Sequence, residues 1–279
     1  MKLNKIIEKE QVKSVKVLHD LHVHSEYSYD SEEALHNYFE IASKNNQTYF
    51  ITTEHIEYMF IGTNCDWTVD YDKMIEELNK LQKEFPNITP LLGIEVGYHK
   101  ENIEKMNKTI NSRNFDQVIM SVHDSGEVDY YYADVALKLG ENEFLTLYFN
   151  NVLEAVKTFD NYDILGHFDY GFKSAYKAFA NVKLQNYQNI VEEIFKELIK
   201  KDKTLEINTK VQSALNDEHL RYFLTLYKNL GGKNITLASD SHEKKNYKYQ
   251  FEHYLQIIKE LGFNKLSYFI NRQRFDYYI

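Results

Sequence analysis

The sequence predicts a single α/β domain over residues 1–279, in which short strands alternate with helices. Seven short, mostly apolar runs are typical of strands that are buried on both faces of a parallel sheet. Amphipathic runs with helical spacing lie between them, and no linker-like or low-complexity stretch divides the chain. Such a sheet can be closed or open, and periodicity alone does not separate the two. We favour a barrel of seven units over a doubly wound open sheet.

The predicted strands occur at intervals along most of the chain. Each is rich in apolar residues and is followed by a polar segment or a helical pattern. They are Val15–His22, Tyr49–Glu54, Leu91–Val96, Gln117–Val122, Tyr162–Gly166, Leu205–Asn208 and Ile235–Ser239.

Helices are predicted by their apolar periodicity and by the residues at their ends. Asp30 and Ser31 are N-cap types, whereas Pro86 and Gly231 lie where helices usually stop. The predicted helices are Ser31–Asn45, Asp70–Phe85, Asn186–Lys200 and Asp217–Leu230, with further helix in part of Asp129–Asp160.

Composition excludes several classes of protein. A net charge of −9 disfavours nonspecific nucleic-acid binding, because the phosphate backbone is itself negative. The lone cysteine, Cys65, allows neither an intrachain disulfide nor a multi-thiolate metal site. The N-terminal segment lacks the apolar core of a signal peptide, and no run is long enough to span a membrane. We therefore expect a cytoplasmic protein that binds neither nucleic acid nor a membrane. A small anionic substrate is still possible, because metal ions reverse the local charge, and composition leaves the oligomeric state open.

Histidine and acidic residues recur where the predicted strands end. The sixth strand ends instead in Asn208. The other six end in Asp20-Leu21-His22-Val23-His24, Glu54-His55, Gly93-Ile94-Glu95, Ser121-Val122-His123, Gly166-His167-Phe168-Asp169 and Ser239-Asp240-Ser241-His242.

These strand ends predict one metal centre. In parallel α/β folds the carboxyl ends of the strands share one face, so residues far apart in sequence converge there. His22 and His24, two apart on an extended chain, point to the same side, and Asp240 and His242 repeat this spacing. Imidazole and carboxylate together suit Zn, Fe or Mn.

A single histidine on an apolar strand is more often a hydrogen-bonded core residue than a ligand. The repeated placement favours metal, because imidazoles and carboxylates crowded together without a cation are costly to bury. The remaining histidines fit no strand end and are interpreted as core or surface residues: His19, His36, His99, His219 and His253.

Taken together, the ordered strand-end motifs from about Val17 to His242 resemble the polymerase-and-histidinol-phosphatase (PHP) superfamily. The chain length and the run Leu205-Glu206-Ile207-Asn208-Thr209 are similar to its histidinol-phosphatase branch. The resemblance implies a distorted, TIM-like barrel of seven β/α units and a site for three divalent ions (Zn, Fe or Mn).

The resemblance also implies which residues bind each ion. The first ion would be held by His22, His24, Glu95 and Asp240. Glu95 would bridge to a second, held also by His123 and His167. A third would take Asp30, His55 and His242. Asp30 can also be interpreted as the N-cap of the helix that follows it.

By the same resemblance, the substrate would be L-histidinol phosphate, hydrolysed to L-histidinol and phosphate in histidine biosynthesis. A metal-bridging hydroxide would attack phosphorus. Glu54 and Asp124 are candidate contacts for the cationic amino alcohol, and Lys173 and Lys210 for the phosphate, although each lysine also suits a solvated surface. Candidates for protonating the leaving group are His242 and Asp169.

Three alternatives remain open at the level of sequence. A PHP phosphoesterase acting on a nucleotide or another small phosphate ester would use the same ligands. A metal-dependent amidohydrolase is disfavoured, because Glu95 and His123, rather than a lysine, end the third and fourth strands. A non-catalytic metal-binding module would bind metal but hydrolyse no ester.

Overall fold

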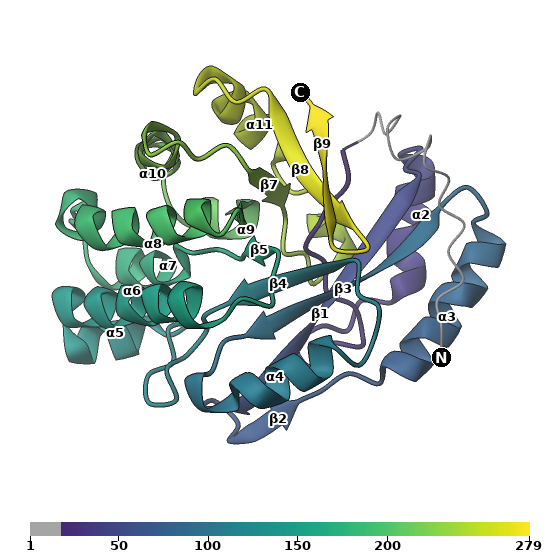
Figure 1. Cartoon of the computed structure of the whole chain (residues 1–279), viewed down its shortest axis with the longest axis horizontal. Coiled ribbons are helices and arrows are strands. Elements are labelled where there is room, and N and C mark those ends of the chain that lie inside the picture. Colours follow the sequence, from purple (N-terminus) through teal and green to yellow (C-terminus); the bar gives the residue numbers. More distant parts are fainter. Residues whose placement is uncertain (1–17) are drawn as a thin grey trace.

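The computed structural model describes residues 18–279 (Figure 1). The strands are β1 (Tyr49–Phe60), β2 (Cys65–Trp67), β3 (Thr89–Gly97), β4 (Gln117–Ser121), β5 (Ile164–Leu165), β6 (Thr204–Asn208), β7 (Ile235–Ala238), β8 (Lys265–Ile270) and β9 (Gln273–Tyr278). The α-helices are α2 (Leu35–Lys44), α3 (Tyr71–Glu84), α4 (Ile103–Ile110), α5 (Ala133–Leu139), α6 (Glu141–Thr158), α7 (Tyr170–Ala178), α8 (Gln188–Lys200), α9 (Thr209–Gln212), α10 (Asp217–Asn229) and α11 (Phe251–Glu260).

Six of the strands form a parallel array in the order β1-β3-β4-β5-β6-β7, and the short β2 pairs antiparallel with β1. The segment around Val23 closes this array into a distorted barrel. Val23 bridges in parallel to Ser241, and its carbonyl accepts the amide of Thr53 at 2.8 Å. It therefore takes the place of a seventh strand between β7 and β1, which confirms the predicted barrel of seven units. We call these seven segments the staves of the barrel.

The first predicted strand, Val15–His22, is wrong as a regular strand. Residues 15–17 lie outside the described part, and residues 18–22 form no ladder. The carboxylate of Asp20 there accepts the backbone amides of Ser239 (2.9 Å) and Lys248 (2.8 Å). Side-chain bonding thus replaces the ladder, and regular pairing is confined to Val23.

The other six predicted strands are confirmed, although β1 is longer and β5 shorter than predicted. Helix α3 begins after Asp70, whose side chain caps it by accepting the amide of Lys73 at 3.1 Å. By contrast, α2 begins at Leu35 rather than at the predicted Ser31. The Ser31 hydroxyl donates instead to the carbonyl of His242 at 2.9 Å and so ties the first loop to the last.

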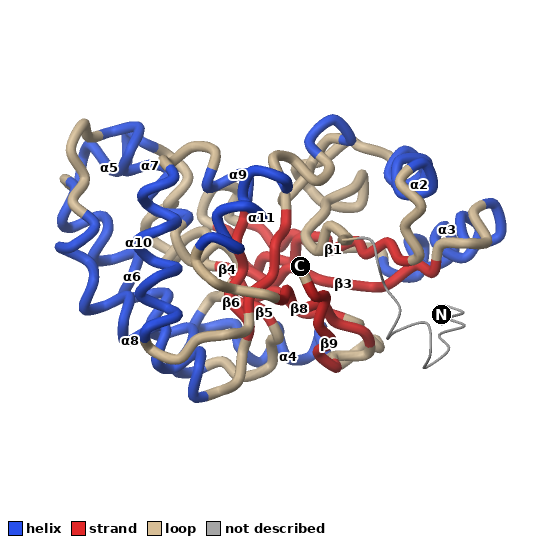
Figure 2. The backbone as a smooth tube through the Cα atoms, turned by 90° about the horizontal axis from the view of Figure 1, so that it is seen from above, coloured by secondary structure: helices blue, strands red, loops and turns tan. Residues whose placement is uncertain are grey.

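Helices pack around the sheet unevenly. In Figure 2, α5, α6, α7, α8 and α10 gather at one side of the central strands, and α2 and α3 lie at the other. Their buried faces are apolar, as in α8, where Val191, Ile194, Phe195 and Leu198 repeat at helical spacing. The barrel is therefore enclosed along its sides, so that a site can form only at one of its two ends.

The β8–β9 hairpin closes the end of the barrel at which the strands begin (Figure 1). Phe269 packs in a buried cluster with Ile119 and Ile164 from β4 and β5. The turn docks on Asp116, which accepts the amides of Asn271 and Arg272 through its carboxylate (2.9 Å) and carbonyl (2.8 Å). The carboxyl ends of the strands therefore form the free end.

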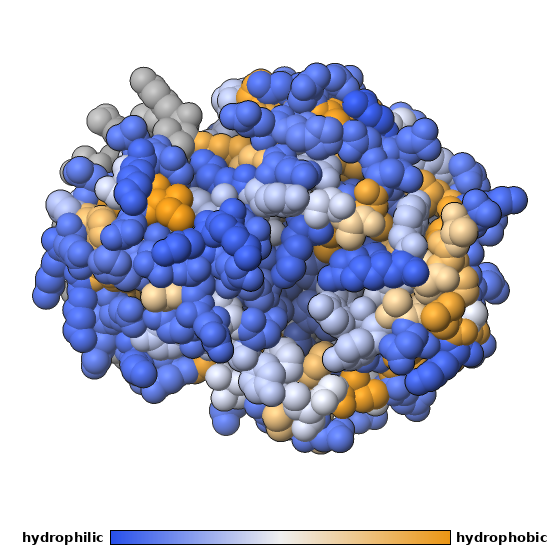
Figure 3. Space-filling view, turned by 180° about the vertical axis from the view of Figure 1, so that it is seen from behind, coloured by the Kyte–Doolittle hydropathy of each residue, from blue (hydrophilic) through white to orange (hydrophobic). Residues whose placement is uncertain are grey.

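The face in Figure 3 is mainly hydrophilic, with apolar side chains in small separate groups. Within residues 18–279, no helix is long and apolar enough to cross a membrane.

His19, which joins the first segment to the C-terminal hairpin, should make stability depend on pH. The side chain is buried, and its Nδ1 shares a hydrogen bond with the hydroxyl of Tyr277. Burial, with Lys248 nearby, lowers the pKa of His19 to about 3, whereas an unfolded histidine titrates near 6.5. The unfolded chain therefore binds a proton between these values that the folded chain does not, so this residue's contribution to stability is lost as the pH falls below about 6.5.

We expect His19→Gln, whose amide can still hydrogen-bond to Tyr277, to flatten the dependence of the unfolding free energy on pH between 4 and 6. The slope should fall by up to about 1.4 kcal/mol per pH unit, the value for one proton. Urea unfolding in a chelator, which removes metal at every pH, would measure it. His253→Gln, at an exposed histidine, is the control. Equal slopes in the two variants would refute the assignment.

Candidate metal centre

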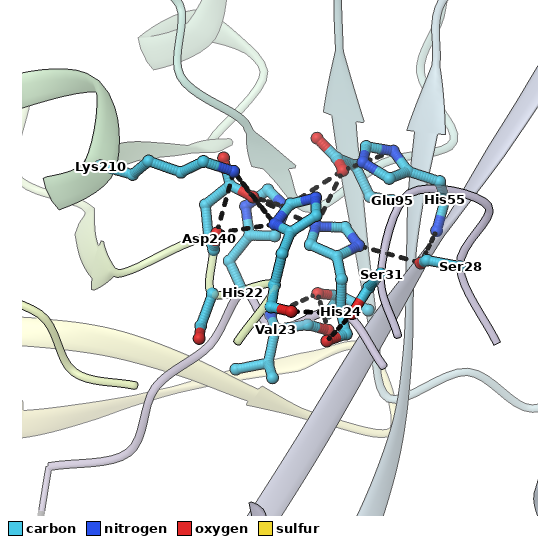
Figure 4. Close-up of polar contacts among 12 residues, drawn as sticks. His22, Val23, His24, Ser28, Ser31, His55, Glu95, Lys210 and Asp240 are labelled. Carbon is cyan, nitrogen blue, oxygen red and sulfur yellow. Dashed lines mark hydrogen bonds and ion pairs between the residues drawn. The ribbon is translucent and has the colours of Figure 1, made fainter. Parts of the chain in front are cut away.

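All nine residues predicted as metal ligands gather at the free end of the barrel. Figure 4 shows His22, His24, His55, Glu95 and Asp240 directed toward one another, with Lys210 reaching in from α9. The segment around Val23 supplies two of the imidazoles, β1 supplies His55 and β3 supplies Glu95. Asp30 lies in the loop before α2, and the other four follow β4, β5 and β7: His123, His167, Asp240 and His242.

Glu95 lies at the centre of the cluster and is fully buried. Its Oε2 atom lies 2.9 Å from Nδ1 of His55. The same oxygen lies 3.1 Å from Nε2 of His22 and 3.4 Å from Nε2 of His24. One carboxylate oxygen thus faces three imidazole nitrogens from two neighbouring staves.

The second oxygen of Glu95 faces a different set of imidazoles. Oε1 lies 2.9 Å from Nε2 of His167 and 3.5 Å from Nε2 of His123. It also accepts the hydroxyl proton of Ser121 at 2.5 Å, which fixes the orientation of the carboxylate. A carboxylate that presents one oxygen to each of two imidazole sets is arranged as a bridging ligand would be.

Asp240 completes the first set. Its Oδ1 atom lies 3.3 Å from Nε2 of His24 and 3.9 Å from Nε2 of His22. The backbone of Asp240 is left-handed, with φ of 53°, a strained conformation for a residue other than glycine that often marks a functional site. Burial opposes ionisation of Asp240, but Lys210 and His22 hold its pKa well below the usual range, so the group is a carboxylate.

The third predicted set is also brought together. Oδ2 of Asp30 lies 2.9 Å from Nε2 of His242 and 3.6 Å from Nε2 of His55. His24 lies beside it, because nitrogens of His24, His55 and His242 are all within 4.8 Å of one another. Asp30 is not the N-cap of α2, which begins after Ala34, so the alternative interpretation of this residue is wrong.

The cluster fits divalent metal ions. Within residues 18–279, five of its buried atoms find no hydrogen-bond partner. One is His167 Nδ1, and the other four are His22 Nε2, His24 Nε2, His55 Nδ1 and Glu95 Oε2. Buried polar atoms without partners are costly, and these four converge on shared points. Burial alone would raise the pKa of Glu95, but His55 and His22 hold it well below the usual range, so its charge is available to a cation. Imidazole and carboxylate donors at these separations suit Zn, Fe or Mn.

A second layer of residues orients the imidazoles, and the predictions missed it. Glu206 accepts from Nδ1 of His22 at 2.7 Å, and Glu57 from Nδ1 of His123 at 2.6 Å. Such contacts hold the other ring nitrogen toward a metal and raise its basicity. Glu57 could have been predicted from its two-residue spacing from His55, which places both side chains on the same side of the strand.

Two residues predicted to contact substrate or transfer a proton lie away from the cluster. Oε2 of Glu54 accepts the amide of Ser25 (2.9 Å) and the hydroxyl of Ser28 (2.6 Å), which braces the first loop. Asp169 is buried with His219, whose Nε2 lies 3.1 Å from its Oδ2. Neither Glu54 nor Asp169 lines the cavity over the cluster.

That cavity, of about 450 Å³, holds the remaining candidates except Asp124, which lines a separate one. Lys173 and Lys210 lie on its wall, with Nζ of Lys173 4.6 Å from the ring centre of Tyr170. Burial, with Lys210 nearby, lowers the pKa of Lys173 to about 8. Phe60 and Trp67, packed 4.5 Å apart between ring centres, form an aromatic part of the wall that the sequence did not reveal.

We expect Glu206→Gln to weaken metal binding without unfolding the barrel. The amide can still contact His22 but no longer draws the Nδ1 proton toward a negative charge, so affinity should fall by about 10- to 100-fold. Competition with a chromogenic zinc chelator would measure this independently of activity. Glu197→Gln, at an ion pair on the surface of α8, is a matched control. Unchanged affinity would show that Glu206 is only a packing residue.

A substitution at Gly97 tests the contact between Glu57 and His123 in a second way. A Cβ atom at Gly97 would lie 1.7 Å from Oε2 of Glu57, so the carboxylate must move and its contact with His123 must break. Gly97→Ala should therefore weaken zinc binding about as much as Glu57→Gln does, by about tenfold or more. The double variant should be no worse than either single variant. Additive losses in the chelator competition would contradict this coupling.

Comparison with known proteins identifies the family. The model of the PHP domain family matches residues 20–210. The histidinol-phosphatase of Lactococcus lactis subsp. lactis is 32% identical over 253 residues, which cover 90% of this chain and 93% of that protein. A protein of Clostridium acetobutylicum named "Probable histidinol-phosphatase" is 29% identical over 245 residues, covering 86% and 92%.

A solved structure extends this likeness to three dimensions. The crystal structure of histidinol phosphate phosphatase from Lactococcus lactis subsp. lactis, complexed with Zn, L-histidinol and phosphate, superimposes with a TM-score of 0.83 at 31% identity. The match covers 92% of this chain and 98% of that one. With a matching family model, a relative above 30% identity and the same fold along nearly the whole chain, this protein belongs to the PHP domain family.

Proposed function

We propose that this protein is a metal-dependent phosphatase that hydrolyses L-histidinol phosphate to L-histidinol and phosphate, a step of histidine biosynthesis. Residues 1–279 would form one phosphoesterase domain. The observation that carries the proposal is the arrangement around Glu95, whose two oxygens face separate sets of imidazoles beneath a small cavity. The relatives named histidinol-phosphatase, one of them seen with Zn, L-histidinol and phosphate, support the choice of substrate.

Three divalent ions would occupy the three ligand sets. His22, His24, Glu95 and Asp240 would hold the first, and Glu95, His123 and His167 the second. Asp30, His55 and His242 would hold the third. Such ions lower the pKa of bound water toward neutrality and neutralise the oxygens of a phosphoryl group.

The protein's own groups would bind and orient the ester. Lys210 lies 3.5 Å from Oδ1 of Asp240, and Lys173 lies on the same wall of the cavity. Their ammonium groups would attract the phosphate and hold it against the cluster. Phe60 and Trp67 would pack against the imidazole ring of the leaving group, because aromatic faces stack well on planar rings.

His242 would act as a ligand rather than as the proton donor. Its Nε2 faces Asp30, and its Nδ1 lies 3.0 Å from both Lys210 Nζ and the carbonyl of Asp240. Neither nitrogen is free to reach a leaving group. Asp169, the other candidate, would act by holding α7 in place through its buried contact with His219.

The proposal is tested by phosphate release from L-histidinol phosphate, with nucleotide monophosphates and p-nitrophenyl phosphate alongside. We expect turnover that requires divalent metal and prefers L-histidinol phosphate. His123→Ala, which removes one imidazole from the second set, should reduce kcat/KM by about 100-fold or more and lower the metal content.

Other outcomes are equally informative. Metal-dependent activity that prefers nucleotides would keep the site and refute the substrate. A full complement of metal with no hydrolysis of any ester would refute the enzymatic proposal and leave a metal-binding module.

A further inference from the structure

A tight hairpin between β4 and α5 overhangs the metal centre. Asp124 and Asp129 bridge its two arms, and Oδ1 of Asp124 accepts the amide of Gly126, a glycine with φ of 81°, at 2.6 Å. The amide of Tyr130 donates to the carbonyl of His123 at 3.0 Å, which ties the hairpin to the end of the β4 stave. Asp124 therefore builds the hairpin, and the residue that the hairpin presents to the site is Asp129.

The carboxylate of Asp129 lines the cavity over the metal cluster and is half-buried. One oxygen accepts the amide of Tyr131 at 2.9 Å, which fixes its orientation. Within residues 18–279, no lysine, arginine or histidine nitrogen lies within 4.0 Å of it in an ion pair. The carboxylate is also outside the four groups of possible metal ligands found in that part of the chain.

The surroundings of Asp129 favour a cationic ligand. Tyr131, Tyr132 and Tyr170 line the cavity as well. Burial, together with the negative charge of Glu57, raises the pKa of Asp129, whereas the amide of Tyr131 and the nearby His123 lower it. The two lysines that line the cavity do not reach it, since Lys173 stacks over Tyr131 and Tyr170, and Lys210 contacts Asp240. A carboxylate held in place without a cation is a preformed site for one.

We infer that Asp129 binds the ammonium group of the amino-alcohol leaving group and so makes the enzyme selective for esters of cationic alcohols. The inference rests on the proposed function. The phosphate would lie toward the lysines and the metal cluster, and the ammonium group toward Asp129. Asp129 would thus be a specificity residue, which contacts substrate without taking part in the transfer of the phosphoryl group.

The test compares two substrates that differ only in the ammonium group. L-Histidinol phosphate and 3-(imidazol-4-yl)propyl phosphate share the imidazole, the chain length and an alkyl leaving group. The wild-type enzyme should prefer the amine by about 10- to 100-fold in kcat/KM. Asp129→Asn, which is isosteric and can still accept the amide of Tyr131, should abolish this preference through a raised KM, with kcat/KM for the deaminated ester unchanged within about twofold.

Two controls separate recognition from folding. Asp129→Glu, which keeps the charge, should retain part of the preference. Asp134→Asn, at an exposed carboxylate on the neighbouring helix, should behave as wild type. Zinc content and unfolding midpoint should be unchanged in all three variants.

The outcomes distinguish the inference from the proposed function. If Asp129→Asn loses activity equally on both imidazole esters, Asp129 acts in catalysis or folding and the inference is wrong, while histidinol-phosphatase activity stands. If the wild-type enzyme does not distinguish the two esters, no residue recognises the ammonium group and the inference is also wrong. If the wild-type enzyme hydrolyses only other esters, the proposed function fails, and this inference with it.

Discussion

The site depends on the contacts between the buried carboxylate of Glu95 and the imidazoles around it. Removed from water and surrounded by imidazoles from several staves, it is stable as an anion only where positive charge or metal compensates the loss of hydration. Each of its oxygens already faces a separate set of ring nitrogens, and Ser121 holds the group in that orientation. Much of the barrel's free end is thus arranged around one side chain near the carboxyl end of β3.

Closure of the barrel is what brings the two ends of the sequence to this carboxylate. Val23 pairs with Ser241 on one side and with Thr53 on the other, so its neighbours His22 and His24 lie between the strand ends that carry Asp240 and His55. An open sheet would leave the first and last motifs at opposite edges. A metal centre built from these ligands therefore requires the closed topology, and a cation shared across the junction would stabilise a closure that depends on few backbone hydrogen bonds.

The sequence allowed the ligand set to be predicted because the pattern repeats wherever a parallel strand ends, and the ends of such strands share one face. The prediction failed where it depended on the exact length of a strand or on the side of the strand to which a residue points. Glu57 was missed because the second strand was predicted to end at Glu54. The strand continues to Phe60, and alternation places Glu57, with His55, on the side of the site. The start of α2 was misplaced for another reason, since Ser31 bonds to the carbonyl of His242, 211 residues away, which no local propensity can indicate.

Trp67 and Asp129 were not predicted, because they lie on segments that local patterns describe poorly, whereas Lys173 and Lys210 were predicted from their places shortly after strand-end motifs. The ligands sit at the ends of the staves, whereas the groups that line the cavity above them come from the connections. Trp67 is on the short β2, Asp129 on the β4–α5 hairpin, Lys173 on α7 and Lys210 on α9. In barrels of this kind the staves fix the position of the chemistry, and the connections can change without moving it. Relatives can therefore keep the metal ligands and differ in the esters they accept, so the choice of substrate is to be sought in the connections rather than in the motifs that identify the family.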